Sequence, residues 1–135
     1  MAWSPAGDDL LVTVDAGGNE HDQLYLVPVA GVSRGEPRAL TAEPDVIHTF
    51  GAWSPDGRAM CYGCNKRHRA FFDVWVMDVF DGSDEARPLL EMDATLAADS
   101  LAHDHASLRF LAERAWGAEG RLTLSRDGRC SGPIA

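Results

Sequence analysis

The fold of this chain is decided by Ala52-Trp53-Ser54-Pro55-Asp56-Gly57, which repeats Ala2-Trp3-Ser4-Pro5-Ala6-Gly7 at a distance of 50 residues. At the same distance, Val74-Trp75-Val76-Met77 repeats the apolar run Leu24-Tyr25-Leu26-Val27. A period of this length is typical of stacked supersecondary units, each of which needs neighbours to cover its apolar surface. The sequence therefore predicts a repeat protein whose function belongs to an assembly of units.

Each unit is expected to contain four short strands beside a Trp-Ser-Pro turn, in which proline presets φ and glycine closes the bend. Residues 65–70 are expected to form a loop between two strands. Arg38 and Arg87 are offset by 49 residues instead of 50, which places one extra residue in a turn near Val32-Ser33. Apolar and β-branched runs predict strands at residues 10–14, 23–29, 38–41, 49–53, 59–63, 73–79 and 87–90.

The last third of the chain lacks the Trp-Ser-Pro signature. Residues 108–112 and 121–125 are placed where the first two strands of a third unit would fall. Alternatively, residues 93–113 are partly helical, because Ala and Leu dominate them and both favour a helix. The sequence thus predicts units at residues 1–50 and 51–92, and a degenerate third unit or an irregular tail at residues 93–135.

The runs at residues 24–27 and 74–77 place apolar side chains on both faces of their strands, so both faces of each sheet must be covered. Four-stranded antiparallel sheets that pack face to face around an axis meet this requirement, and that architecture is a β-propeller. We predict an all-β fold, a partial β-propeller with two clear four-stranded antiparallel blades plus a degenerate third. Such a chain is too short to close a ring alone, so its expected partners are further blades or copies of itself.

Composition and charge restrict the class of protein. The 135 residues are 45% apolar and 24% charged, as in a soluble globular domain, and the net charge of −9 predicts no nucleic-acid partner. No apolar run approaches the roughly 18 residues of a membrane-spanning helix. The start of the sequence lacks a signal peptide, which predicts the cytoplasm, or the periplasm if a leader precedes this sequence. Cys61, Cys64 and Cys130 are expected to be reduced thiols.

Ala52 to Arg58, together with Phe72 to Asp78, resembles the blade signature of TolB-like, WD-like propellers and of the propeller domain in prolyl oligopeptidase family serine peptidases. Residues 18–26 and 45–53 are similar to segments common in bacterial members of the peptidase family. In that family the propeller caps an α/β-hydrolase domain with a Ser-Asp-His triad and admits small peptides. The resemblance implies a non-catalytic scaffold and gate for a hydrolase domain absent from this sequence, or alternatively a TolB-like protein-binding propeller without enzymatic activity.

Two short motifs suggest chemistry, and their contexts argue against it. Gly31-Val32-Ser33-Arg34-Gly35 spells the nucleophile elbow of hydrolases, but the repeat places it over a hairpin turn where no helix begins. Cys61-Tyr62-Gly63-Cys64 spells a redox or zinc motif, but side chains three apart on a strand point to opposite faces. If Gly63 ended the strand, the two thiols could converge with His68. We expect core thiols and no catalytic residue.

Two clusters remain as candidate sites. His103-Asp104-His105 could place two imidazoles on one face for a metal, or could form a wet turn, and we predict no metal and no cofactor. The dense basic cluster Lys66, Arg67, His68 and Arg69 precedes Phe71 and Phe72. A basic loop of this kind can bind carboxylates or phosphates, which makes it a candidate partner or substrate loop, or it is a solvated hairpin.

The remaining recurring residues are assigned to structure. Trp3 and Trp53 recur with the repeat and Trp75 falls opposite Tyr25, so all are expected to pack between blades. The pairs Asp56-Gly57, Asp81-Gly82 and Asp127-Gly128 are expected to form turns.

Overall fold

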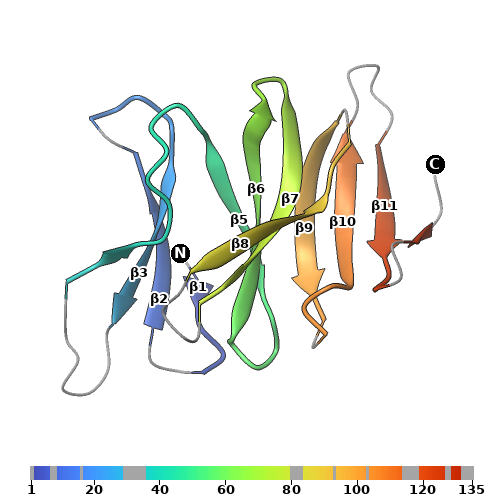
Figure 1. Ribbon diagram of the computed structural model, residues 1–135, viewed down its shortest axis with the longest axis horizontal. Coiled ribbons are helices and arrows are strands. Elements are labelled where there is room, and N and C mark those ends of the chain that lie inside the picture. The colour runs from blue at the N-terminus through green and yellow to red at the C-terminus, as the bar shows by residue number, and fades with distance from the viewer. Residues whose placement is uncertain are drawn as a thin grey trace.

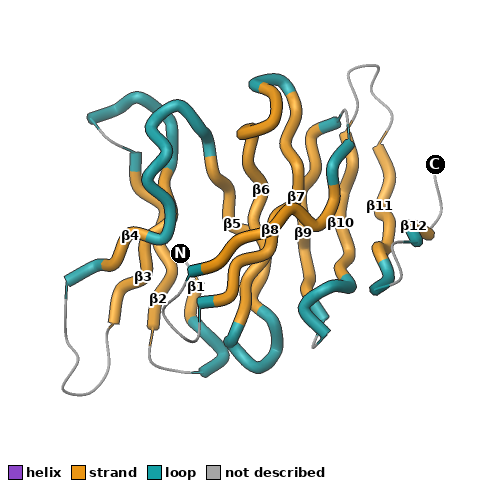
Figure 2. The backbone as a smooth tube through the Cα atoms, viewed as in Figure 1, coloured by secondary structure: helices purple, strands orange, loops and turns teal. Residues whose placement is uncertain are grey.

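The computed structural model of the chain consists of strands and connecting loops (Figure 2). The residues that it describes are 2–6, 9–15, 17–28, 36–79, 84–92, 94–102, 104–113, 119–126 and 129–131. Nowhere in these ranges is there a helix long and apolar enough to cross a membrane. The predicted all-β class is therefore confirmed, and the helical alternative for residues 93–113 is wrong because they form two strands and a turn.

The described strands form three blades of four antiparallel strands, which follow one another in chain order across the molecule (Figure 1), and one pairing joins the second and third blades into an eight-stranded sheet. The first blade contains β1 (Ala2–Trp3), β2 (Asp9–Val14), β3 (Gln23–Pro28) and β4 (Arg38–Ala39). The second blade contains β5 (His48–Trp53), β6 (Ala59–His68), β7 (Phe71–Asp78) and β8 (Glu85–Leu90). The third blade contains β9 (Thr95–Leu101), β10 (Leu108–Glu113), β11 (Glu119–Leu124) and β12 (Cys130–Ser131).

One parallel backbone pairing links the second and third blades. Phe72 of β7 pairs with Thr95 of β9 in parallel, and the Phe72 amide donates to the carbonyl of Ala94 over 3.0 Å. All other strand pairs are antiparallel neighbours within one blade. The chain is thus a partial β-propeller of three blades, and the unit predicted as degenerate has all four strands.

Two apolar layers lie between the blades. Because successive side chains of a strand alternate between the two faces of its sheet, the second blade contributes to both layers. The layer between the first and second blades contains Leu11, Leu24, Leu26, Leu40, Met60, Tyr62, Cys64, Met77 and Val79. The layer between the second and third blades contains Ala59, Cys61, Val74, Val76, Ala94, Leu96, Leu101, Leu108, Phe110 and Leu124.

The tryptophans are less buried than the repeat predicts. Trp53 and Trp75 lie half-buried against the first apolar layer, whereas Trp3 is 61% exposed. The prediction that Trp3 packs between blades is therefore wrong for this chain. Trp3 pairs with Leu10, so it lies on the face of the first blade that turns away from the second.

The turn that opens each blade recurs in backbone geometry even where its sequence does not. In the second blade the Ser54 amide donates to the Ala59 carbonyl over 2.8 Å, and the Gly57 amide donates to the Ser54 carbonyl over 2.9 Å. In the third blade the Ala102 amide donates to Ser107 over 2.8 Å, and the His105 amide donates to Ala102 over 3.0 Å.

His105 therefore takes the place of Gly57 in this turn, and both residues have left-handed backbones with φ of 56° and 72° respectively. The offset between the two positions is 48 residues, close to the period of 50 residues between the first two blades. Asp104 corresponds in the same way to Asp56. Asp104 and His105, considered above as part of a metal motif, thus occupy the positions of Asp56 and Gly57 in the turn.

Gly57 is expected to be the most sensitive position in these turns. A Cβ at Gly57 would lie 2.8 Å from the backbone nitrogen of Ala6, whereas a Cβ at Gly17, with φ of 66°, would have nothing within 4 Å. Gly17→Ala should therefore lose about 1 to 2 kcal/mol from backbone strain alone. Gly57→Ala should lose about 1 to 2 kcal/mol more, because the first blade's turn must move. Urea unfolding of the two variants measures the difference, and equal losses would contradict the contact.

Candidate functional site

The basic cluster of residues 66–69 lies at the end of the molecule where β6 turns into β7 (Figure 1). Its description as a loop is wrong, because β6 continues through His68 and the turn is limited to Arg69 and Ala70. A register irregularity between Cys64 and His68 lets the strand continue, and His68 then pairs with Phe71. The backbone of residues 66–68 therefore belongs to a strand, and only Arg69 lies in the turn.

Arg67 is committed to a buried carboxylate. Its Nε donates to Asp73 Oδ2 over 2.7 Å and its Nη2 donates to Asp73 Oδ1 over 2.9 Å, while Asp73 is fully buried. The same Nη2 donates to the carbonyl of Met92 over 2.9 Å, and the Met92 amide donates to Asp73 Oδ1 over 3.2 Å. This fork ties the β6–β7 hairpin to the segment that leads into β9, so Arg67 stabilises the fold.

Lys66 joins the first two blades. Its Nζ lies 3.0 Å from Glu43 Oε2 and 5.4 Å from the centroid of the Trp75 ring. The other oxygen of Glu43 lies 3.5 Å from Nε2 of His48, whose side chain is fully buried. At 3.5 Å this second contact is electrostatic and too long for a good hydrogen bond. Lys66 is thus partly occupied by a carboxylate of the chain itself.

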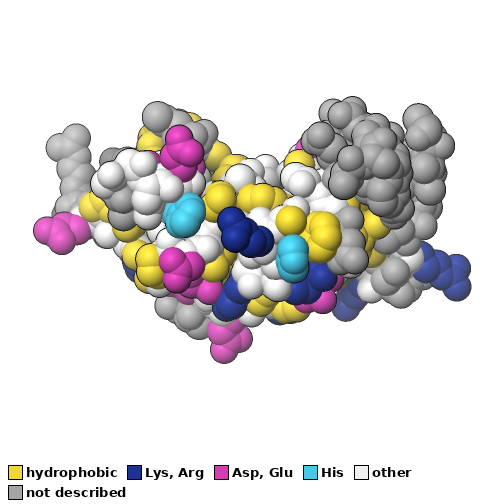
Figure 3. All heavy atoms as spheres, turned by 90° about the horizontal axis from the view of Figure 1, so that it is seen from above, with side chains coloured by type: hydrophobic (Ala, Val, Ile, Leu, Met, Phe, Trp, Pro, Cys, Tyr) yellow, Lys and Arg dark blue, Asp and Glu magenta, His cyan; other side chains and the backbone are white. Residues whose placement is uncertain are grey.

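All four members of the cluster are exposed, but among the described contacts only Lys66 and Arg67 form ion pairs. The His68 ring stacks on Phe71 with centroids 4.7 Å apart, and both His68 and Arg69 are exposed. Within the described part of the chain, no ion pair or hydrogen bond involves the Arg69 guanidinium. Seen from this end, basic and histidine side chains lie among apolar ones (Figure 3). Arg69 and the Nε2 of His68 could take a carboxylate or a phosphate without breaking an ion pair of the fold.

Gln23 organises the same end of the molecule and has no motif that would reveal it. Its amide nitrogen donates to the carbonyls of His21, Glu43 and Val46 over 2.9 to 3.2 Å. Its amide oxygen accepts from the Thr41 hydroxyl over 2.9 Å and from the Glu43 amide over 3.1 Å. Four of these five hydrogen bonds hold the segment that leads from β4 to β5. The only signal in the sequence is a polar residue at the start of an apolar strand.

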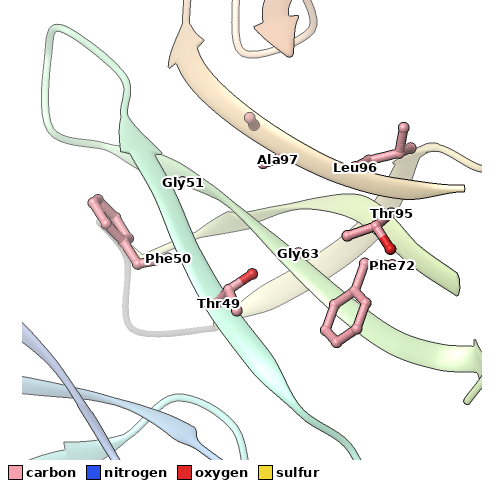
Figure 4. Close-up of a pocket in the computed structure, with 9 residues that line it drawn as sticks. Thr49, Phe50, Gly51, Gly63, Phe72, Thr95, Leu96 and Ala97 are labelled. Carbon is pink, nitrogen blue, oxygen red and sulfur yellow. The ribbon is translucent and has the colours of Figure 1, made fainter. Parts of the chain in front are cut away.

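A pocket of about 250 Å³ opens beside the cluster, between β5 and β9. Phe72 of β7 and the two hydroxyl-bearing residues Thr49 and Thr95 surround it (Figure 4). A Cβ at Gly63 would lie 2.8 Å from the Thr49 hydroxyl, so glycine keeps the floor of the pocket open. Its lining suits a small apolar group and contains no acid, base or thiol. The residues that line it are Thr49, Phe50, Gly51, Gly63, Phe72, Thr95, Leu96, Ala97 and Ala98.

The two cysteines of β6 lie on opposite faces of the second blade. Cys61 is buried in the layer toward the third blade, and Cys64 is buried in the layer toward the first. Burial raises the pKa of the Cys61 thiol to about 11, and burial likewise raises the pKa of Cys64. Both groups are therefore protonated thiols near neutral pH, unsuited to nucleophilic or zinc chemistry.

A serine, an aspartate and a histidine meet at the opposite end of the second blade. The Ser54 hydroxyl donates to Asp56 Oδ1 over 2.6 Å, and His105 Nε2 lies 3.2 Å from each Asp56 carboxylate oxygen. Asp56 lies between the other two side chains, so His105 cannot take a proton from Ser54 as the base of a catalytic triad does. The cluster joins the second blade to the third and activates no nucleophile.

The candidate metal motif is only partly described. His103 lies outside the described residues, and Asp104 accepts hydrogen bonds from the Ala106 and Ser107 amides and from the Ser107 hydroxyl over 2.7 to 2.9 Å. Over the described ranges, no three potential metal ligands converge. The G-x-S-x-G stretch at residues 31–35 and the pairs at 81–82 and 127–128 also lie outside the described residues.

Acid is expected to loosen the contact between the second and third blades. Hydrogen bonds from Ser54 and from the Arg58 amide hold the pKa of Asp56 far below its ordinary 3.8. Hydrogen bonds from Ala106 and Ser107 lower the pKa of Asp104 to about 2. A lowered folded-state pKa contributes stability above the unfolded value, and that contribution is lost as the pH falls through the folded value.

Urea midpoints measured from pH 7 to pH 2 should therefore fall steeply below about pH 4. In Asp56→Asn the fall should be shallower, because the ionised carboxylate is already absent. Asp45→Asn is the matched control, since Asp45 is exposed and accepts no hydrogen bond from the described residues. A pH profile of Asp56→Asn identical to that of the unmodified chain would contradict this assignment.

Solved structures similar to this chain contain TolB and prolyl oligopeptidase propellers. A protein assigned to TolB from Agrobacterium tumefaciens has a TM-score of 0.71 and 23% identity, over 96% of this chain and 43% of that one. TolB from Acinetobacter baumannii has a TM-score of 0.68 and 16% identity, over 96% of this chain and 30% of that one. Prolyl oligopeptidase B from Galerina marginata has a TM-score of 0.72 and 18% identity, over 98% of this chain and 19% of that one.

No family model matches the chain, and no curated protein matches its sequence. The chain spans less than half the length of each of the three similar structures. The resemblance to TolB-like and prolyl oligopeptidase propellers is confirmed in the fold, and at these identities it establishes the fold alone.

Proposed function

We propose that these residues form a non-catalytic, three-blade part of a β-propeller that supports and gates the α/β-hydrolase domain of a prolyl oligopeptidase-like serine peptidase. The hydrolase domain and further blades belong to the same parent protein, outside residues 1–135. The observation that carries the proposal is the match of almost the whole chain to a small part of the Galerina marginata peptidase. In this role the propeller limits access to short peptides and performs no chemistry itself.

The exposed side chains of His68 and Arg69 support a gating role. They lie at one end of the second blade, beside a pocket that suits a small apolar group. A peptide carries both kinds of group, a terminal carboxylate and apolar side chains. Guanidinium recognises carboxylate through paired hydrogen bonds, so this end is suited to guide a short peptide.

The alternative function is a TolB-like propeller that binds other proteins and has no hydrolase domain. The Agrobacterium tumefaciens structure favours it. This chain covers 43% of that structure, but only 19% of the peptidase. A reading frame that begins with a signal peptide and continues only into blades supports this alternative and a periplasmic location. A reading frame that continues into an α/β-hydrolase segment supports the peptidase.

Hydrolysis assays test the proposal on two polypeptides. The 135-residue chain should give no turnover of short proline-containing peptides or of esters above the buffer rate, and Ser33→Ala should change nothing. The complete natural polypeptide should cleave the peptides and leave folded proteins intact. Turnover by the short chain that Ser33→Ala abolishes would contradict a non-catalytic role. A complete polypeptide without peptidase activity would favour the binding function.

A further inference from the structure

His48 is a fully buried histidine that links the first two blades. It begins β5, and its ring Nδ1 lies 3.1 Å from the carbonyl oxygen of Asp22, the residue that precedes β3. The His48 amide donates to the same carbonyl over 3.1 Å. A carbonyl oxygen only accepts, so the ring forms a hydrogen bond with it only when Nδ1 carries a proton. The first blade therefore fixes the position of one ring proton.

The other ring nitrogen faces a carboxylate. His48 Nε2 lies 3.5 Å from Glu43 Oε1, and it has no hydrogen-bond partner among the described residues. An ionised carboxylate also only accepts. A neutral ring with its one proton on Nδ1 turns the lone pair of Nε2 toward this oxygen, and the two acceptors repel each other. A ring that is protonated on both nitrogens attracts the carbonyl and the carboxylate together.

Further charged groups near the ring come from the first blade and from β6. Asp22 and His48 line one pocket of about 290 Å³, which gives protons a path from solvent to the ring. Lys66 Nζ lies 3.0 Å from Glu43 Oε2, so the same carboxylate also has a cation beside it. In the described part of the chain, Glu43 is the residue whose charged group lies against a ring nitrogen of His48.

Neutral groups complete the surroundings of the ring. From β6, Cys64 pairs with His48 in the sheet, and the Tyr62 ring centroid lies 5.9 Å from that of His48. Burial raises the pKa of the Cys64 thiol and the pKa of the Tyr62 hydroxyl, so both are uncharged near neutral pH. Leu11 and Thr13 of β2 line the pocket and carry no charge.

We propose that protonation of His48 controls the contact between the first and second blades at this end of the molecule. The imidazolium binds the Asp22 carbonyl and the Glu43 carboxylate together, whereas the neutral ring keeps the carbonyl and releases the carboxylate to Lys66. Histidine ordinarily changes charge between about pH 5 and 8. The contact therefore strengthens as the pH falls through this range and is lost as the pH rises. It applies equally to a peptidase and to a binding propeller, so it goes beyond the proposed function.

NMR spectra of the histidine rings test the proposal, with long-range couplings between ring protons and ring nitrogens recorded from pH 5 to pH 8.5. We expect the neutral His48 ring to carry its proton on Nδ1, which is the tautomer that the Asp22 carbonyl requires. In Glu43→Gln the pH midpoint of the His48 signals should fall by about half a pH unit to one pH unit, because Nε2 then meets an amide donor in place of an anion.

Asp45→Asn is the matched control for charge, because Asp45 is exposed and belongs to the same segment. It should leave the His48 midpoint unchanged. Glu43→Gln should keep the fold, since Gln23 holds the Glu43 backbone through its amide and its carbonyl. A neutral ring protonated on Nε2 would overturn the proposal, and so would equal midpoints in Glu43→Gln and the unmodified chain. The tautomer is measured on the unmodified chain, so it does not depend on the folding of a variant.

Hydrogen exchange measures the consequence for the blades. After correction for the intrinsic exchange rate, the His48 amide should be about threefold to tenfold better protected at pH 5.5 than at pH 8, the factor that corresponds to half a pH unit to one pH unit. The Ser54 amide, which donates within the second blade, should keep its protection, and in Glu43→Gln both amides should be insensitive to this change of pH.

Equal pH dependence of the His48 and Ser54 amides in the unmodified chain would contradict control by His48. The pH range also separates this effect from that of Asp56, which is expected below about pH 4. Neither measurement uses peptidase activity, so failure of the pH-dependent contact is distinguishable from failure of the proposed function.

Discussion

Arg67→Ala is expected to lower the free energy of unfolding by about 3 to 5 kcal/mol, one of the largest losses from a single substitution in this chain. The fully buried Asp73 carboxylate would lose both guanidinium hydrogen bonds, at 2.7 and 2.9 Å. Only the Met92 amide would remain as a donor to that carboxylate among the described contacts. Urea unfolding followed by circular dichroism measures the loss.

Arg69→Ala is the matched control, because Arg69 is two residues away and exposed. It should change the unfolding free energy by less than about 0.5 kcal/mol. Asp73→Asn added to Arg67→Ala should recover part of the loss, because the neutral amide carries no uncompensated charge into the interior. Similar losses for Arg67→Ala and Arg69→Ala would show that the fork does not stabilise the chain.

Phe110→Ala is expected to cost about 3 to 5 kcal/mol, because it removes a fully buried ring and leaves a cavity between the second and third blades. The third blade should unfold first, since each blade of a repeat array is stabilised chiefly by its neighbour. The unfolding transition followed by circular dichroism should therefore broaden or split as well as shift.

The repeat supplies an internal series for this substitution. Val12, Tyr62 and Phe110 hold the same position in the first, second and third blades. Tyr62 is 3% exposed, so Tyr62→Ala should also cost several kcal/mol, whereas Val12 lies on the face of the first blade that turns away from the second, and Val12→Ala should cost about 1 kcal/mol or less. A loss at Val12 equal to that at Phe110 would mean that Val12 is as well covered in this chain as Phe110.

The turns, and the need of each sheet for a neighbour on both faces, could be predicted from the sequence because both depend on residues close together in the chain. Proline restricts the backbone and glycine frees it, each at a fixed position of a turn. Ser54-Pro55-Asp56-Gly57 therefore indicates a turn by itself. Alternating apolar residues on both faces of β3 and β7 require cover on both sides. The third blade was harder to predict. Its turn is held by backbone hydrogen bonds and by the Asp104 carboxylate, so the turn forms without the Trp-Ser-Pro residues.

The contacts of the basic cluster could not be predicted, because they join residues through space. Arg67 and Asp73 meet across an irregular hairpin, and Lys66 meets Glu43 of a different segment. The sequence therefore suggested one basic cluster, whereas the structure pairs Lys66 and Arg67 with carboxylates of the chain and shows no such pair for His68 and Arg69 among the described residues. Gln23 was missed for the same reason, since its four partner residues are spread over residues 21–46.

By itself, the sequence determined the strand-and-turn units, their order and the need of each sheet for a neighbour, because these follow from backbone preferences and side-chain alternation. Only the tertiary structure decided which of two identical repeat positions is buried. Trp53 and Trp3 have the same local sequence, yet one is packed against the first blade and the other is 61% exposed. The difference arises because burial depends on a covering surface, and that surface belongs to another blade.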